Sequence, residues 1–144
     1  MAVFSHLLDT SVYSQPVRRT MHPGVAARWP SVTPQTAAIS AICEAEVLYG
    51  LRKFGSPQMR AAYDSILRGH FSVLHVNEDV AATYADLRCD CEQAGVTVQA
   101  LDLLIAATAK THGLIVATLN VRHFSPILGL KVEDWSQPPA PPSQ

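Results

Sequence analysis

The sequence contains little cysteine and no hydrophobic run long enough to cross a membrane. Only Cys43, Cys89 and Cys91 carry thiols among 144 residues. Cys89 and Cys91 are two positions apart, so on a helix they point to different faces and cannot form a disulfide with each other. No apolar run reaches the ~18–20 residues of a membrane span, and the N-terminus lacks the pattern of a secretory signal. We therefore expect a cytoplasmic protein with free thiols and no membrane association.

A strong net charge is also absent. Eleven Lys and Arg residues oppose twelve Asp and Glu residues, which leaves a formal net charge of −1 at pH 7. This balance argues against strong non-specific binding to nucleic acid and against attraction to a membrane surface. A polyanionic substrate would therefore need a local basic patch or a bound cation to offset its charge.

Several motifs of well-known catalytic classes are missing. The sequence contains neither the G-x-x-x-x-G-K-[ST] nor the G-x-G-x-x-G pattern of phosphate-binding loops, and no G-x-S-x-G nucleophile elbow. No spacing of His and Cys resembles a zinc site. A phosphatase of the haloacid-dehalogenase type would carry a second aspartate two positions after Asp9, where this chain has Ser11. These absences argue against common nucleotide-binding, serine-hydrolase and zinc-dependent mechanisms.

The sequence does contain a regular alternation of short apolar strands and helices. Strands are predicted over residues 3–8, 37–40, 71–76, 114–117 and 130–132. Helices are predicted over residues 12–19 with a break at Pro16, 22–30, 41–53, 56–69, 78–94 and 99–111. This order predicts one α/β domain over residues 1–135, with helices on both faces of a mostly parallel sheet of four to five strands. The proline-rich segment 136–144 is predicted to be a flexible, disordered tail.

Polar residues stand at the ends of two of these strands. Asp9 follows the first strand, and Thr118 and Asn120 follow the strand over residues 114–117. Sites in parallel α/β sheets lie beyond the carboxyl ends of the strands, so these side chains are candidates for a common site. Asp9-Thr10-Ser11 is also typical of a helix N-cap. Both interpretations stay open, because a capping carboxylate can still face a site.

Three further acids lie on predicted helices. The helix over residues 41–53 contains Glu44 and Glu46, and Asp102 opens a later helix. Apolar side chains surround the helix over residues 41–53 on nearly every side. Periodicity therefore predicts a mostly buried helix without showing which glutamate faces inward. A buried glutamate is costly unless it is paired or binds a metal, so at least one of the two should have a partner.

Carboxylate and amide oxygens in this arrangement suit Mg²⁺ or Mn²⁺, which prefer oxygen ligands. Such an ion can polarise a phosphoryl oxygen during hydrolysis of a phosphate ester. Of the six histidines, only His123 stands near this site in the sequence. We expect His123 to have a surface or core role rather than a catalytic one.

Four motifs that follow one another along the chain resemble those of the PIN-domain ribonucleases, and most closely those of the VapC-type toxins of bacterial toxin–antitoxin systems. The motifs are Leu7-Leu8-Asp9-Thr10-Ser11, Ile39-Ser40 with Glu46-Val47-Leu48-Tyr49-Gly50, Asp102-Leu103-Leu104-Ile105-Ala106-Ala107, and Thr118-Leu119-Asn120 with Phe124. The resemblance extends over about residues 3–135. It implies a PIN-like, three-layer α/β/α fold.

The resemblance also implies roles for individual residues. The helix glutamate of the family stands four residues before a glycine, which selects Glu46, before Gly50, over Glu44. The metal ligands would be Asp9, Asp102 and Glu46, and the ion would be Mg²⁺ or Mn²⁺. The remaining site residues would be Thr10 and Thr118, which position ligands or water, and Asn120 as an auxiliary catalytic group. The family often has aspartate at the last position, so Asn120 puts a second tightly held ion in doubt.

The same resemblance implies partners. The substrate would be single-stranded or looped RNA, commonly tRNA, the chain would form a homodimer, and the C-terminal segment of a cognate VapB-like antitoxin would fill the active groove. Candidates for contacts to the RNA backbone are Arg18, Arg19, Arg28, Arg52, Lys53 and Arg122. For Arg18, Arg19 and Arg28, on two short helices, a solvated surface is the alternative to a basic rim over the site. Two rival functions are a non-catalytic scaffold that binds RNA or a partner protein, and a small Mg²⁺-dependent phosphatase.

Overall fold

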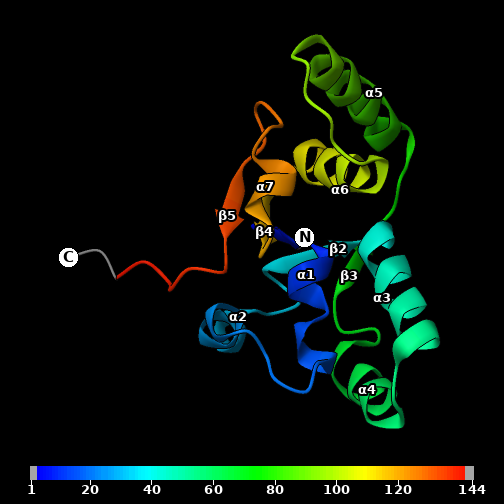
Figure 1. Cartoon of the computed structure of the whole chain (residues 1–144), viewed down its shortest axis with the longest axis vertical. Coiled ribbons are helices and arrows are strands. Elements are labelled where there is room, and N and C mark those ends of the chain that lie inside the picture. Colours follow the sequence, from blue (N-terminus) through cyan, green and yellow to red (C-terminus); the bar gives the residue numbers. More distant parts are fainter. Residues whose placement is uncertain (1–2, 142–144) are drawn as a thin grey trace.

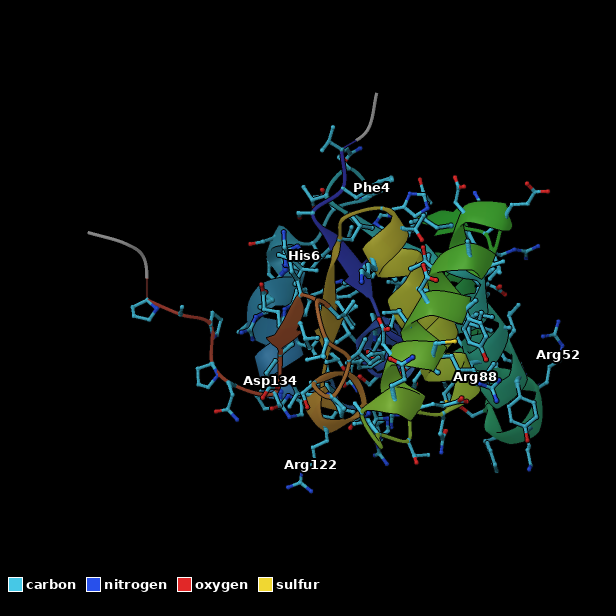
Figure 2. All side chains as sticks on the ribbon, turned by 90° about the horizontal axis from the view of Figure 1, so that it is seen from above. Phe4, His6, Arg52, Arg88, Arg122 and Asp134 are labelled. Carbon is cyan, nitrogen blue, oxygen red and sulfur yellow. The ribbon has the colours of Figure 1, made fainter. Side chains whose placement is uncertain are left out.

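The fold is built on a central sheet of five parallel strands. The computed structural model describes residues 3–141 of the chain. The strands lie in the order β3-β2-β1-β4-β5, and every neighbouring pair is parallel. Their bounds are β1 (His6–Leu8), β2 (Ala37–Ser40), β3 (Ser72–Leu74), β4 (Ile115–Thr118) and β5 (Val132–Asp134). The carboxyl ends of all five strands therefore lie at the same edge of the sheet. In Figure 2, His6 and Asp134 mark the two opposite ends of the strands.

Helices cover both faces of this sheet. They are α1 (Thr10–Tyr13), α2 (Pro23–Arg28), α3 (Ala41–Phe54), α4 (Pro57–Ala62), α5 (Glu78–Gln93), α6 (Ala100–Thr111) and α7 (Val121–Phe124). Short 3₁₀ turns, η1 (Gln15–Val17) and η2 (Trp29–Ser31), and a π-helical turn, η3 (Tyr63–Leu67), complete the structure. Figure 1 shows α5 and α6 on one side of the sheet and α2 and α4 on the other. The predicted three-layer α/β/α architecture is confirmed.

The central strands are apolar on both faces because helices pack against both. The side chains of Leu7, Leu8, Ala38, Val116 and Ala117 have no exposed surface. Strands buried in this way have near-continuous apolar sequences rather than alternating ones, which explains why the pattern is visible in the sequence. Within residues 3–141, no helix is both long and apolar enough to span a bilayer.

Several strand boundaries differ from those predicted, and β4 covers Ile115–Thr118 rather than residues 114–117. The first strand begins at His6 rather than at residue 3, because its neighbours β2 and β4 begin opposite His6. Val3 is consequently 84% exposed. The third strand ends at Leu74, before the exposed Val76. Its predicted first residue, Phe71, instead packs edge-on against two aromatic rings, those of Tyr13 and Trp29.

The last strand is shifted toward the C-terminus. It covers Val132–Asp134 rather than residues 130–132, since its register places Glu133 beside Ala117 and Asp134 beside Thr118. Two acids at the end of a strand are unfavourable by propensity alone. The strand tolerates Glu133 because its carboxylate accepts a hydrogen bond from the Trp135 indole at 2.8 Å and pairs with His6 at 3.2 Å.

The prediction that the helix over residues 41–53 is mostly buried is wrong. Cys43, Val47 and Leu51 form the buried side of α3. Tyr49 and Phe54 are 59% and 73% exposed, respectively. The rings of both residues lie against the ammonium group of Lys53, with ring centroids 5.5 and 5.2 Å from Nζ. Helix α3 therefore carries more apolar side chains than it buries in the core.

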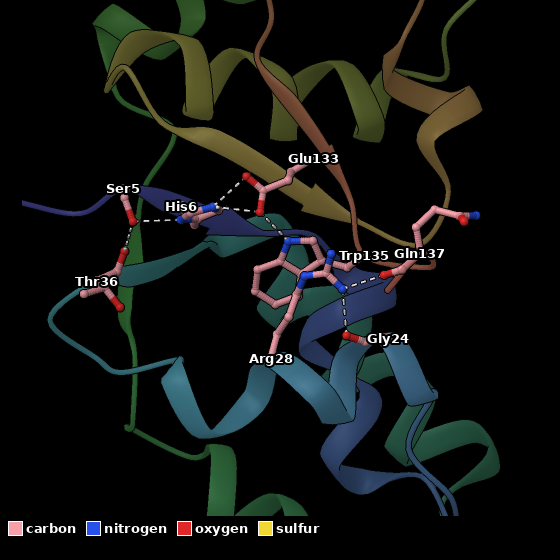
Figure 3. A network of polar contacts seen from close by, with 8 residues as sticks. All are labelled: Ser5, His6, Gly24, Arg28, Thr36, Glu133, Trp135 and Gln137. Atoms are coloured by element: carbon pink, nitrogen blue, oxygen red, sulfur yellow. Dashed lines mark hydrogen bonds and ion pairs between the residues drawn. The ribbon is translucent and has the colours of Figure 1, made fainter. Parts of the chain in front are cut away.

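A polar network fastens the C-terminal end of β5 to α2 (Figure 3). Arg28 donates two hydrogen bonds through Nη1, to the carbonyl of Gly24 at 2.9 Å and to that of Gln137 at 2.7 Å. Its guanidinium group also lies 5.4 Å from the Trp135 ring centroid. Part of the predicted flexible segment, Ser136 and Gln137, thus makes defined contacts. Residues 142–144 lie outside the described residues, so disorder of the tail stays a prediction.

Candidate active site

Asp9 lies where β1 ends and α1 begins, and it is both a helix cap and a carboxylate at the carboxyl edge of the sheet. Its carboxylate caps α1, since Oδ1 accepts a hydrogen bond from the Val12 N–H at 3.2 Å. Oδ1 also accepts from the Ser11 hydroxyl at 2.6 Å, and Oδ2 accepts from the Thr118 hydroxyl at 2.7 Å. Only 5% of Asp9 is exposed. The carboxylate is therefore a buried acceptor of three hydrogen bonds at the carboxyl edge of the sheet.

The turn after β4 is tied to this carboxylate. Thr118 is fully buried, and its hydroxyl accepts a hydrogen bond from the backbone N–H of Asn120 at 2.9 Å. Ser11, which is not among the predicted site residues, accepts one from the N–H of Leu119 at 3.0 Å. The position of Ser11 two residues after an acid at a strand end is the signal in the sequence for this role. Asn120 is exposed at the same edge.

Glu46 reaches the site from α3. The Thr10 hydroxyl donates to Glu46 Oε1 at 2.6 Å, which links the first residue of α1 to this helix. Ser40 at the end of β2 caps α3 through the N–H of Cys43 and so starts the helix at the carboxyl edge. Glu46 lies about one and a half turns further along α3, still within reach of α1.

Glu44 has different partners. It accepts hydrogen bonds from the phenol groups of Tyr13 at 2.9 Å and Tyr63 at 2.5 Å. Burial, together with the hydrogen bond to Glu44, raises the pKa of Tyr63 to about 12, and the same causes raise the pKa of Tyr13. Both phenols are therefore protonated donors near neutral pH. The expectation that at least one of the two glutamates is paired is confirmed, since both are.

Asp102 lies in the first turn of α6. Since α6 runs back across the sheet before β4, its N-terminus lies at the carboxyl edge of the strands. The carboxylate Oδ2 is 3.3 Å from Nδ1 of His123, on α7. No part in the site was predicted for His123, yet it is the polar partner of a predicted metal ligand. No signal within the local sequence pairs the two, since α6 and α7 are separated by β4.

Burial changes the acidity of two of these carboxyl groups. It raises the pKa of Asp9 from the ordinary value of 3.8, and the hydrogen bonds from Ser11 and Thr118 offset this only in part. Burial likewise raises the pKa of Asp102, and the neighbouring His123 offsets part of that increase. Each negative charge is therefore less stable in the folded chain than in water.

The donor chemistry of the site fits a hard divalent cation. The carboxylates of Asp9, Glu46 and Asp102 and the hydroxyl groups beside them are the oxygen ligands or supporting groups that such ions prefer. In the described part of the chain, neither Asp9 nor Glu46 forms an ion pair with a cationic side chain. Over the same residues, however, no three His, Cys, Asp or Glu side chains form a ready-made ligand cluster. Each carboxylate is instead held by its own protein partner.

The predicted RNA-contacting residues are spread over several surfaces. Arg18 shares a cavity of about 300 Å³ with Thr10 and Glu46. Arg19 lies with Arg18 on the rim of another cavity of about 720 Å³, beside α4. Figure 2 shows Arg122 extending from the carboxyl end of the sheet, near Asp134, and Arg52 extending from a different part of the surface. Arg18 is thus the basic candidate that lines a cavity together with a predicted metal ligand.

Arg28 and Lys53 are engaged elsewhere. The guanidinium group of Arg28 is held by Gly24, Trp135 and Gln137, and the ammonium group of Lys53 lies against two aromatic rings. Contacts of either residue with RNA stay predictions. For Arg28, such a contact would compete with the hydrogen bonds that fasten the C-terminal segment.

The raised pKa of Asp9 predicts a pH-dependent difference in stability between the wild-type chain and Asp9→Asn. A raised carboxyl pKa stabilises the fold below the unfolded value, near 3.8, and this contribution is lost as the pH rises through the folded pKa. Asparagine does not titrate. We therefore expect the Tm of the metal-free variant to rise relative to wild type as the pH increases from about 4 to 7. Thermal unfolding in EDTA measures this, and a difference in Tm that is independent of pH would contradict it.

Comparisons with known proteins agree with this geometry. The PIN domain profile matches residues 6–126. The tRNA(fMet)-specific endonuclease VapC of Shigella flexneri is 32% identical over 98 residues, which are 68% of this chain and 74% of that protein. Toxin FitB of Neisseria gonorrhoeae is 33% identical over 124 residues, 82% of this chain and 89% of that protein. The crystal structure of DNA-bound VapBC from Salmonella typhimurium matches with a TM-score of 0.80 and 26% identity, over 92% of this chain and 98% of that one. The chain therefore belongs to the PIN-domain family and is similar to its VapC-type members.

Proposed function

We propose that this chain is a metal-dependent endoribonuclease toxin that cleaves phosphodiester bonds in single-stranded or looped RNA. The observation that carries the proposal is the buried Asp9 carboxylate, which lies at the carboxyl edge of the sheet without a cationic partner among residues 3–141. The similarity to an endonuclease of the VapC type supports the same reaction. A divalent cation is the simplest counter-charge for this carboxylate, and RNA brings further negative charge that needs one.

The residues of the site have distinct roles in this proposal. Asp9, Asp102 and Glu46 would hold Mg²⁺ or Mn²⁺, and the ion would supply positive charge against the charge that develops on the phosphate. The hydroxyl groups of Ser11 and Thr118 orient the Asp9 carboxylate through the hydrogen bonds at 2.6 and 2.7 Å. Thr10 orients Glu46 in the same way. Asn120 is an uncharged auxiliary group, so we propose one tightly bound ion rather than two.

The same similarities support two of the proposed partners. The name of the Shigella relative specifies tRNA(fMet), and we propose tRNA as the substrate class here. The Salmonella structure is of VapBC, which supports a VapB-like antitoxin as the protein partner. We also propose a homodimer. Arg18 and Arg122 are the basic residues best placed to contact the RNA backbone, because Arg18 shares a cavity with Glu46 and Arg122 extends from the carboxyl end of the sheet.

Metal dependence is tested directly with purified protein and labelled tRNA. We expect cleavage in Mg²⁺ or Mn²⁺, loss of cleavage in EDTA, and recovery when the cation is restored. Calorimetric titration with Mn²⁺ in the absence of RNA separates this enzyme from a scaffold that has no need of a metal. Cleavage that is unaffected by EDTA would contradict the metal-dependent mechanism, and hydrolysis of a chromogenic phosphate without RNA cleavage would favour a phosphatase. Mapping the ends of cut RNA after expression in growing cells would identify the substrate.

A further inference from the structure

A second contact joins α1 and α3, in addition to the hydrogen bond from Thr10 to Glu46. Glu44 accepts hydrogen bonds from the phenol groups of Tyr13, at the end of α1, and Tyr63, at the start of η3. Tyr13 has no exposed surface, and Tyr63 is 9% exposed. One carboxylate therefore connects three elements that are distant in sequence. The function proposed above gives these residues no role.

This connection is adjacent to the site because both helices carry site residues. Helix α1 has four residues and begins with Thr10, whose hydroxyl donates to Glu46. It ends with Tyr13, whose hydroxyl donates to Glu44. The two glutamates are two positions apart on α3. The short helix is thus fixed to α3 at both of its ends, by Thr10 to Glu46 at the site and by Tyr13 to the half-buried Glu44.

Helix α1 depends on such contacts for its position. A helix of one turn has almost no stability of its own, so tertiary contacts determine where it lies. Its N-cap is Asp9, whose Oδ1 accepts from the Val12 N–H, so a displacement of α1 changes the surroundings of that carboxylate. The placement of Asp9, Thr10 and Glu46 relative to one another is therefore sensitive to the contact between Tyr13 and Glu44.

We propose that Glu44 is a positioning residue that holds α1 against α3, so that Asp9 and Glu46 keep the arrangement needed to bind the divalent cation. The inference rests on the function proposed above. Resemblance to the family selects Glu46 as the functional glutamate of α3, and the hydrogen bonds of the half-buried Glu44 give it a supporting role. Tyr13 links α1 to Glu44 through its hydrogen bond, and Tyr63, on η3, donates a second hydrogen bond that orients the Glu44 carboxylate.

The test uses Glu44→Gln and Tyr13→Phe in the full chain. Glu44→Gln removes the negative charge and replaces one carboxylate oxygen by an NH2 group, so the two phenols can no longer both donate to a charged carboxylate. Loss of a group that orients a metal ligand costs about 10- to 100-fold in metal affinity or activity. We expect each variant to lower Mn²⁺ affinity by this factor in calorimetry without RNA. We also expect kcat for RNA cleavage to fall by a similar factor, with little change in KM.

The two substitutions should not be additive, because both weaken the hydrogen bonding of the same carboxylate. The Mn²⁺ affinity of the double variant Glu44→Gln/Tyr13→Phe is expected to be about the same as that of the single variant with the lower Mn²⁺ affinity. Glu78→Gln serves as the matched control, because Glu78 is exposed on α5. It should leave Mn²⁺ affinity and kcat unchanged. All measurements are made below the Tm of each variant, determined by thermal unfolding.

The outcomes separate this inference from the proposed function. If wild type binds Mn²⁺ and cleaves RNA, and Glu44→Gln lowers Tm without changing either property, Glu44 is only structural and the inference is overturned. If Glu44→Gln does not fold, Tyr13→Phe decides the matter, since it keeps the aromatic ring in the core. If wild type neither binds Mn²⁺ nor cleaves RNA, the proposed function fails, and the inference fails with it.

Discussion

Asp9→Asn is expected to reduce kcat for RNA cleavage by about a thousandfold, because a catalytic metal lowers the activation barrier by several kcal/mol and each ~1.4 kcal/mol is tenfold in rate. The amide carries no charge and offers one oxygen in place of two. It therefore weakens the site in two ways, by removing a negative ligand and by reducing the number of acceptors. Cleavage of labelled tRNA under single-turnover conditions measures kcat, and calorimetry measures the accompanying loss of Mn²⁺ affinity.

We expect Asp9→Asn to keep the wild-type fold. Asparagine is a good N-cap residue, so it can still accept from the Val12 N–H. Its amide group would face the Thr118 hydroxyl, which can accept a hydrogen bond in place of donating one. Asp86→Asn, at an exposed position of α5, is the matched control and should cleave RNA at the wild-type rate. If Asp9→Asn is as active as wild type, Asp9 is not a metal ligand.

Gly24→Ala is expected to destabilise the protein by about 3 kcal/mol, the upper part of the range for overpacking, which corresponds to roughly 10 °C in Tm. A Cβ atom on Gly24 would lie 2.0 Å from the backbone carbonyl oxygen of Trp135 and 3.2 Å from the carbonyl carbon of Ser136. These are backbone atoms, which cannot rotate away as a side chain can. Helix α2 would have to move from β5, and the hydrogen bonds of Arg28 would be strained.

Gly50→Ala is the matched control, with an expected change of opposite sign. Gly50 also lies within a helix, α3, but apart from its chain neighbours and the adjacent backbone of that helix no atom of the described residues lies within 4 Å of the position that its Cβ would occupy. Alanine in a helix is more favourable than glycine by about 0.5–1 kcal/mol, so Tm should rise slightly. Thermal or urea unfolding of the two variants measures both effects. A Gly24→Ala variant as stable as Gly50→Ala would show that α2 is not packed against the Trp135 backbone.

The sequence predicts the elements of the fold better than their boundaries. The apolar segments of β1, β2 and β4 are recognisable because helices bury these strands on both faces. The edge strand β5 is displaced from its predicted position, since its bounds depend on pairing with β4 and on partners for Glu133. The burial of α3 is overestimated because composition does not show which side of a helix has a neighbour. Tyr49 and Phe54 lie on the exposed side of α3, where no core residue among residues 3–141 packs against the helix.

The candidate site is predicted in part. Asp9, Thr10 and Thr118 are recognisable because polar residues at the end of a buried strand are a local signal. Asp102 is recognisable as the acid that opens a helix, and Glu46 is selected over Glu44 by the resemblance to the PIN-domain family. The partners of Asp9 include Ser11, which the prediction omits, and Asp102 is paired with His123, for which no role in the site is expected. Arg28, a candidate for a basic rim, also holds the C-terminal segment, and no role of this kind is predicted for it. Each difference concerns a partner, which local sequence patterns do not specify.

Three properties of this protein can be derived without coordinates. They are its α/β class, the order of its strands and helices along the chain, and the location of Asp9 and Thr118 at strand ends. These properties follow from hydrophobic periodicity and from polar residues adjacent in the chain. The partners of the two α3 glutamates cannot be derived in this way: Glu46 contacts Thr10, while Glu44 contacts Tyr13 and Tyr63. The same holds for the engagement of Arg28 by Gln137. Such contacts join residues that are 19 to 109 positions apart, so they exist only once the sheet and its helices have packed.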